Sequence, residues 1–233
     1  MTLTLAYNWA RLIYASLRLA DVCCLLAILI GCQQPIEPVS YEDLCGLTSE
    51  QMGVIDEEDV RHWIEEEYSY APAESEEVIG GESIVIYIWE YDGITANAYL
   101  RDGRLFRISL HHVENGPTFG QVVAGLGPPE MVDRHAGMYE PVLYTVSLDY
   151  PALGVSVGAS GLEKRNRLMH EDRLATPLTQ DMVVDHIECY TPGSMEDILR
   201  EVFSLPPEYV AYHIQRRIPW PGFGALVPLE YQH

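Results

Sequence analysis

The chain has 233 residues, of which 48% are hydrophobic and 21% charged, so it is long and apolar enough to form a globular core. It contains 14 basic and 35 acidic residues, which gives a formal net charge of −21. This charge repels phosphate backbones and anionic lipid headgroups, so nucleic-acid binding and electrostatic docking on a membrane are disfavoured.

The first distinctive segment is an uncharged apolar run of ten residues from Val22 to Gly31. A membrane-spanning helix needs about 20 residues, so this run is too short to cross a bilayer. It ends in Leu29-Ile30-Gly31-Cys32, which resembles the lipobox of bacterial lipoproteins. Arg11 and Arg18 provide the positive flank of a signal peptide, although Asp21 is atypical there. A plain signal peptide and an internal helix are the alternatives.

The resemblance to bacterial lipoproteins implies that Cys32 carries the lipid and that residues 1–31 are a signal peptide that is removed. Residues 32–47, with Pro35 and Pro38, are then expected to form a flexible tether. From residue 32 onward 12 basic and 34 acidic residues remain, a net charge of −22. Lipid rather than charge would therefore hold the protein, which we expect to be extracytoplasmic and membrane-anchored, with another envelope protein as its partner.

Besides the lipidated Cys32, the predicted mature chain contains two cysteines, Cys45 and Cys189. A disulfide is permitted in a compartment outside the cytoplasm, and two separately buried thiols are the alternative. A bridge would close a loop of about 145 residues and constrain the unfolded chain by up to about 5 kcal/mol.

The next region, 48–112, has the pattern of one helix followed by three antiparallel strands. Asp56 can cap a helix that extends to Tyr68, and its acidic start lacks the spacing of a calcium loop. Residues 72–81 are glutamate-rich and are predicted to be a loop. Alternation then predicts strands over 84–91, 94–101 and 104–112, joined at Asp-Gly turns.

The two following regions, 113–180 and 181–233, share an order of parts. Residues 108–132 and 185–210 each contain a strand end, a helix and a Pro-Pro pair, after which we expect a strand. Strands are accordingly predicted over 142–150, 152–158 and 209–218. The fold class predicted for the whole chain is α+β, with repeated units of a helix plus an antiparallel β-meander and with the helices on one face of the sheet.

A family resemblance arises from residues 118–158, where a helix ends in Leu126-Gly127-Pro128-Pro129 and Tyr144 follows on a strand. This stretch resembles the small lipoproteins of the SmpA/BamE type and the similarly built β-lactamase-inhibitor modules. The resemblance implies a helical layer on a sheet and a role in binding other proteins. It assigns no functional residue here.

One catalytic pattern occurs: Gly154-Val155-Ser156-Val157-Gly158 fits the Gly-x-Ser-x-Gly motif of hydrolases. Asp181 or Asp185 and His186 or His213 follow in hydrolase order. Ser156, however, lies in an alternating run, which favours a strand serine over a nucleophile at a strand-to-helix turn. The sequence thus does not predict an enzyme.

No metal site or cofactor site is predicted. Histidines His111 and His112 are neighbours on a strand and face opposite sides. Four further histidines show no ligand spacing among themselves: His135, His170, His186 and His213.

Trp220 and Phe223 in the C-terminal tail are candidates for a protein interface or for a lid over the core. Two functions are therefore open. One is a lipid-anchored protein-binding or scaffold module of the cell envelope. The other is a small-ligand receptor or hydrolase with a pocket between the repeats, in which Ser156 is the candidate nucleophile.

Overall fold

The computed structural model describes residues 36–68, 71–171 and 173–231, and the described residues from Glu37 onward form one compact unit. The predicted signal peptide, the lipobox and Cys32 lie outside the described residues. Within the described part of the chain, every helix is too short or too polar to span a membrane.

The helices are short. They are α2 (Tyr41–Cys45), α3 (Glu57–Tyr68), α4 (Phe119–Leu126), α5 (Arg165–Leu168), α6 (Met195–Asp197), the π-helical turn η1 (Ile198–Val202) and α7 (Pro207–Gln215).

Most of the ordered backbone is in strands. The first seven are β1 (Ala73–Ile79), β2 (Glu82–Tyr91), β3 (Ile94–Arg101), β4 (Arg104–His111), β5 (Met131–Ala136), β6 (Val142–Tyr150) and β7 (Val155–Glu163). The remainder are β8 (Met169–His170), β9 (Arg173–Pro177), β10 (His186–Tyr190), β11 (Ile218–Pro219), β12 (Leu226–Pro228) and β13 (Glu230–Tyr231).

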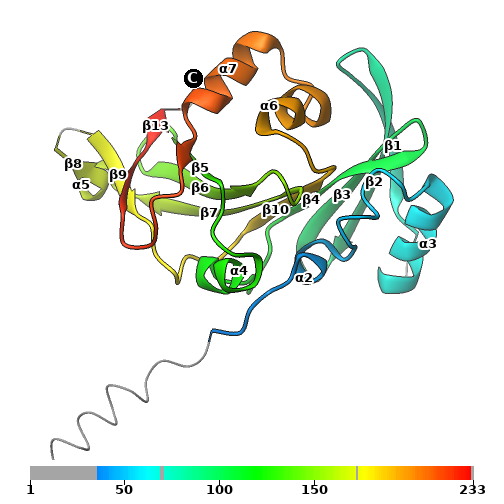
Figure 1. The fold of residues 1–233 in the computed structure, drawn as a ribbon, viewed down its shortest axis with the longest axis horizontal. Helices are drawn as coiled ribbons and strands as arrows, with labels where there is room; N and C mark the ends of the chain where they lie inside the picture. Colours follow the sequence, from blue (N-terminus) through cyan, green and yellow to red (C-terminus); the bar gives the residue numbers. More distant parts are fainter. Residues whose placement is uncertain (1–35, 69–70, 172, 232–233) are drawn as a thin grey trace, which may run out of the picture. The chain divides into compact units, whose positions relative to one another are not determined.

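Within the described residues, ten strands form one sheet in the order β1-β2-β3-β4-β10-β7-β6-β5-β11, with β13 beside β5. All of these pairs are antiparallel except β13 with β5. A smaller sheet has the order β12-β9-β8. Strand β10 lies between β4 and β7, so it joins the meander β1–β4 to the strands β5–β7 (Figure 1).

The predicted α+β class, with repeated units and helices on one face, is wrong. The protein is mostly antiparallel sheet with small helices. Because β10 pairs with both β4 and β7, strands from all three predicted units belong to one sheet. The helices also cover both faces: α2, α3 and α4 pack into the main core, whereas α6, η1 and α7 form separate clusters on the other face (Figure 1).

The two Pro-Pro pairs have different consequences. Strand β5 follows Pro128-Pro129, as expected, but helix α7 begins at Pro207, where a strand over 209–218 was predicted. Proline is well suited to the first turn of a helix because its fixed φ is helical and no N–H is needed there. Pro207 therefore starts a helix, and the expected strand is wrong.

The glutamate-rich segment 72–81, predicted to be a loop, instead contains the edge strand β1, which pairs with β2 from Ala73↔Ile88 to Ile79↔Glu82. Gly80 and Gly81 both have positive φ, at 62° and 90°, and form the turn between the two strands. The sequence did not indicate this strand because β1 lies at the edge of the sheet and both of its faces are largely exposed to solvent. Its glutamates therefore show no alternation of apolar and polar residues.

The predicted meander over 84–112 is confirmed by β2, β3 and β4. Its two turns have positive φ at both central residues, Asp92-Gly93 and Asp102-Gly103, as tight hairpins require. The preceding helix is also confirmed: Asp56 Oδ1 accepts a hydrogen bond from the Asp59 N–H at 3.1 Å, which caps α3.

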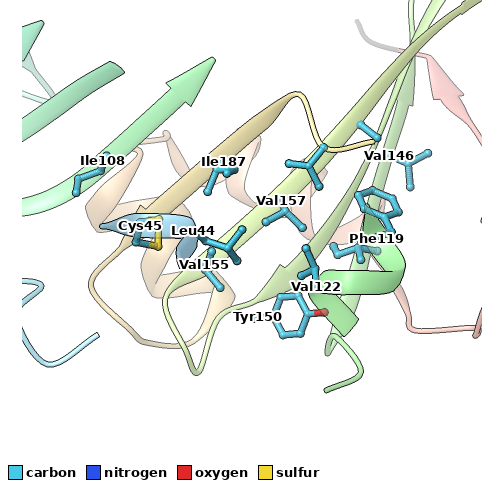
Figure 2. Close-up of a cluster of buried hydrophobic side chains, with 14 of the residues drawn as sticks. Leu44, Cys45, Ile108, Phe119, Val122, Val146, Tyr150, Val155, Val157 and Ile187 are labelled. Carbon is cyan, nitrogen blue, oxygen red and sulfur yellow. A yellow bond between two sulfur atoms is a disulfide. The ribbon is translucent and has the colours of Figure 1, made fainter. Parts of the chain in front are cut away.

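The main core lies between the sheet and helices α2, α3 and α4. Figure 2 shows Phe119 of α4 beside Val146 of β6, and Val122 of α4 between Phe119 and Tyr150, with α2 further along the same face. Cys45 of α2 and Cys189 of β10 form a disulfide with a Cα–Cα distance of 6.0 Å. The tether expected over 32–47 is thus folded from Tyr41 onward, because α2 is covalently joined to the central strand.

Candidate functional site

Strand pairing brings polar side chains from distant parts of the sequence onto one face of the main sheet. Alternate residues of a strand share a face, and so do directly opposite residues of paired strands. One row of such partners is Ser109, Glu188, Ser156 and Asp149. The adjacent row is His111, His186, Gly158, Ser147 and Asp133.

A pocket of about 300 Å³ lies over these two rows, and we call it the polar pocket. Its sheet wall contains Asp133, His135, Ser147, Asp149, Ser156, His186, Glu188 and Tyr190. The facing wall is apolar and consists of Met195, Leu199, Phe203 and Leu205. His213, Arg216 and Arg217, from the end of α7, complete the lining.

The apolar wall includes the π-helical turn η1, in which the Phe203 N–H donates to the Ile198 carbonyl at 3.1 Å. Leu199 of this turn is part of the pocket lining. Turns of this kind are rare and often occur at functional sites.

Two arginines at the end of α7 are held by a buried aspartate. The Asp133 carboxylate accepts hydrogen bonds from Arg216 Nε and Nη2, at 2.6 and 2.7 Å, and lies 3.2 Å from Arg217 Nη2. Burial alone would raise the pKa of Asp133, but Arg217 and Arg216 outweigh it, so the pKa lies below its usual value. This cluster fastens the end of α7 to β5.

A second buried carboxylate, Asp149, lies on β6. It accepts hydrogen bonds from Arg217 Nε at 2.8 Å and from the Ser156 hydroxyl. The Tyr190 hydroxyl lies 3.5 Å from Ser156 Oγ. Burial raises the pKa of Asp149, and Arg217 opposes that rise. The Ser156 hydroxyl therefore donates to a buried carboxylate that is paired with an arginine, and its hydrogen-bond partners are Asp149 and Tyr190 rather than an imidazole.

His186 has a different pair of neighbours. Its Nδ1 lies 2.7 Å from Asp185 Oδ1, and its Nε2 lies 3.3 Å from Ser147 Oγ. The other Asp185 oxygen accepts the Ser160 N–H at 2.9 Å. Burial would raise the pKa of Asp185, but the bonds from His186 and Ser160 lower it below its usual value. Carboxylate, imidazole and hydroxyl thus follow one another in hydrogen-bonding distance.

Two further histidines line the polar pocket without a hydrogen bond to their rings from any described residue: His135 and His213. Burial, followed by the nearby Arg216 charge, lowers the pKa of His213 to about 4 and also lowers that of His135. Both imidazoles are consequently neutral at pH 7, so each offers one donor and one acceptor to a ligand.

The remaining charge in the lining, Glu188, is paired with Arg107 of β4. Its carboxylate accepts Arg107 Nε and Nη2 at 2.8 and 3.0 Å, and the Ser109 hydroxyl at 2.8 Å. The Arg107 guanidinium also lies 4.5 Å from the ring centres of both Tyr99 and Phe203. Every carboxylate in the lining thus has an arginine partner.

The structure brings together only some of the residues that the hydrolase motif suggested. Ser156 is the second residue of strand β7, as its alternation predicted, and does not lie at a strand-to-helix turn. Asp185 and His186 contact each other, but the serine beside His186 is Ser147, which no motif marks. His213 lines the same pocket, and Asp181 is fully exposed and absent from the lining.

Trp220 and Phe223 contact each other edge to face, with ring centres 5.0 Å apart, and both are partly buried against the main core. In the described part of the chain, no group of three or more histidine, cysteine or carboxylate side chains has the geometry of a metal site. The ring Nε2 of His111 lies 2.7 Å from the Ser109 hydroxyl, so this histidine has a hydrogen-bond partner within its own strand.

No protein-family model, curated protein or solved structure matches the chain. The resemblance of residues 118–158 to SmpA/BamE-type lipoproteins and β-lactamase-inhibitor modules stays a prediction.

Proposed function

We propose that the protein is a lipid-anchored extracytoplasmic receptor that binds a small uncharged ligand in the polar pocket. The observation that carries this proposal is the composition of the lining. Its charged groups are paired with one another, whereas the His135 and His213 rings have no hydrogen bond from a described residue. A charged ligand would find no free counter-charge, but an uncharged one can hydrogen-bond to the imidazoles.

The two unlike walls further restrict the ligand. One wall carries hydroxyls and imidazoles, and the other carries Leu199, Phe203 and Leu205. A flat molecule with hydrogen-bonding groups along one side and an apolar face satisfies both walls. Nucleobases are flat, uncharged molecules of this kind and are the first probes, and methyl glycosides, whose puckered rings also have an apolar face, are the second.

The binding test uses the full chain in a nonionic maltoside detergent. We expect a binding probe to shift the imidazole Cε1–H signals of His135, His186 and His213 and to give a saturable heat of binding. Leu205→Trp, at a half-buried position in the apolar wall, should fill the pocket and abolish binding. Leu143→Trp, at an exposed position of β6, is the matched control. Binding that survives Leu205→Trp, or binding of charged analogues with equal affinity, would contradict the proposal.

The location rests on the Leu29-Ile30-Gly31-Cys32 motif and is supported by the disulfide between Cys45 and Cys189, because disulfides persist in oxidising compartments. To test lipid anchoring, a bacterium that expresses the protein is grown with radioactive palmitate, and incorporation of label into the protein is measured. We expect label in the wild type and none in Cys32→Ala. Crosslinking in intact membranes, with and without Cys32, would report an envelope partner at the same time. Unlabelled wild-type protein would contradict lipid anchoring.

A hydrolase is the second candidate, favoured by the order of Asp185, His186 and Ser147. Ser147 Oγ would add to an ester carbonyl while His186 Nε2 takes its proton and returns it to the leaving alkoxide, after which water releases the acid. The backbone of Ser147 pairs with strands on both sides, so an oxyanion donor must be a side chain, and the neutral His135 lines the same pocket. We expect a fluorophosphonate probe to label Ser147, and labelling should persist in Ser156→Ala. An unlabelled Ser147 would exclude this candidate.

The protein-binding role expected from the sequence is less well supported. Its proposed anchors, Trp220 and Phe223, are partly buried against the core and against each other, which reduces the ring surface left for a partner.

A further inference from the structure

A second and larger pocket, of about 570 Å³, lies on the opposite face of the sheet between α2, α3 and the strands. Its floor is apolar and is formed by Ile94, Ala96, Ile108, Leu110 and Ile187. Ile108 and Ile187 alternate with residues of the polar face, so this pocket is separate from the polar pocket.

Four aromatic rings from α3 and β2 form one wall of this pocket: Trp63, Tyr68, Trp89 and Tyr91. The Trp63 ring is nearly perpendicular to that of Trp89, at 86°, and to that of Tyr68, at 82°, with ring centres 6.0 and 6.1 Å apart. Both contacts are edge to face, and the rings of this wall that keep exposed surface are Trp63 and Tyr68, which are partly buried, and Tyr91, which is half-exposed. The Trp89 side chain is buried and hydrogen-bonds to the Tyr68 side chain, which links the two elements of this wall.

The charged side chains in the lining are all acidic: Glu42 and Asp43 of α2 and Glu67 of α3. The Asp43 carboxylate caps the start of α2, where it accepts a hydrogen bond from the Ser40 N–H at 2.8 Å. The Glu42 and Glu67 side chains have no hydrogen-bond or ion-pair partner among the described residues. Two free carboxylates therefore stand beside an aromatic wall and an apolar floor.

We propose that this aromatic–acidic pocket binds a small organic cation, whose ammonium head contacts the rings and whose apolar body lies on the floor. The negative faces of tryptophan and tyrosine rings attract a cation, and the attraction is strongest for a quaternary ammonium, which is weakly hydrated. Glu42 and Glu67 supply the counter-charge. The same carboxylates repel anions, and they give no advantage to an uncharged apolar ligand.

The test compares choline with 3,3-dimethylbutan-1-ol, which has the same shape without the charge. Binding of each to the full chain in maltoside detergent is measured by calorimetry and by tryptophan fluorescence. We expect choline to bind about tenfold more tightly than the uncharged alcohol. Equal affinity for the two compounds, or no binding of either at millimolar concentration, would overturn the proposal.

Variants separate the contributions of the rings and the carboxylates. Tyr91→Leu, at a half-exposed position where the fold should tolerate it, is expected to weaken choline binding several-fold without changing affinity for the alcohol. Glu67→Gln should reduce the preference for choline over the alcohol. Trp220→Leu removes a tryptophan outside the pocket and should leave binding unchanged. A choline affinity that is equal in Tyr91→Leu, Glu67→Gln and the wild type would place the cation elsewhere.

Discussion

Gly158 of β7 lies directly opposite His186 of β10, and the imidazole of His186 occupies the space that a side chain at Gly158 would need. A Cβ built on Gly158 would lie 1.8 Å from Cε1 of His186. The backbone at Gly158 does not have positive φ, so the requirement for glycine here is steric rather than conformational.

Gly158→Ala is therefore expected to displace the His186 ring from Asp185 and Ser147 while the sheet remains folded. The NMR chemical shift of the His186 Cε1–H signal should change, and ligand binding in the polar pocket should weaken. Ala159→Ser, the neighbouring position on the opposite face, does not contact the His186 ring and serves as the control. An unchanged His186 signal in Gly158→Ala would contradict this account.

Removing the Asp133 carboxylate should be strongly destabilising. Asp133→Asn leaves Arg216 and Arg217 buried without one of their counter-charges, and the free energy of unfolding should fall by about 3–5 kcal/mol. Urea unfolding monitored by circular dichroism measures the change. Glu163→Gln, which breaks the exposed pair with Arg167, should cost less than about 0.5 kcal/mol. If the two variants lost similar amounts of unfolding free energy, burial of the Asp133 ion pair would not be the cause of the destabilisation.

Stability should fall as the pH is lowered from 6.5 toward 4, and His213 should contribute to that fall. The pKa of His213 is about 4 in the folded protein, against an ordinary value of 6.5. Between these values the unfolded chain binds a proton that the folded protein does not, so acid favours unfolding. His213→Asn should make the free energy of unfolding less dependent on pH in this window. Urea midpoints at pH 7 and pH 5 test it, and an equal drop in both proteins would contradict it.

Loss of the disulfide should destabilise the protein because the bridge spans 144 residues. In the chain-entropy description, Cys45→Ser with Cys189→Ser lowers the free energy of unfolding by up to about 5 kcal/mol. Both cysteines are replaced because a single replacement would leave the other cysteine as an unpaired thiol. The melting temperature of the double variant should match that of the reduced wild type. A double variant as stable as the oxidised wild type would mean that the bridge contributes nothing.

Local signals in the sequence were sufficient for the meander and for α3, because Asp-Gly turns and the Asp56 cap act between near neighbours. They failed for β1, whose exposed glutamates show no alternation, and for α7, where the sequence does not say whether Pro207 ends one element or begins another.

The polar pocket could not be predicted because it depends on long-range pairing. His186 comes to lie beside Gly158 and His111 only when β10 inserts between β7 and β4. Asp185 and His186 were recognisable as candidates, but Ser147 has no motif around it, and its place beside His186 follows from the register of β6 on β7.

The bond between Cys45 and Cys189 also determines how the protein responds to mechanical force. Tension applied to the chain before Cys45 passes through sulfur into β10, a strand that is held by neighbours on both sides. If the two ends are pulled apart, residues 46–188 lie in a covalently closed segment outside the load path. Stretching can then extend only the two ends, and most of the sheet is mechanically shielded for as long as the bond is intact.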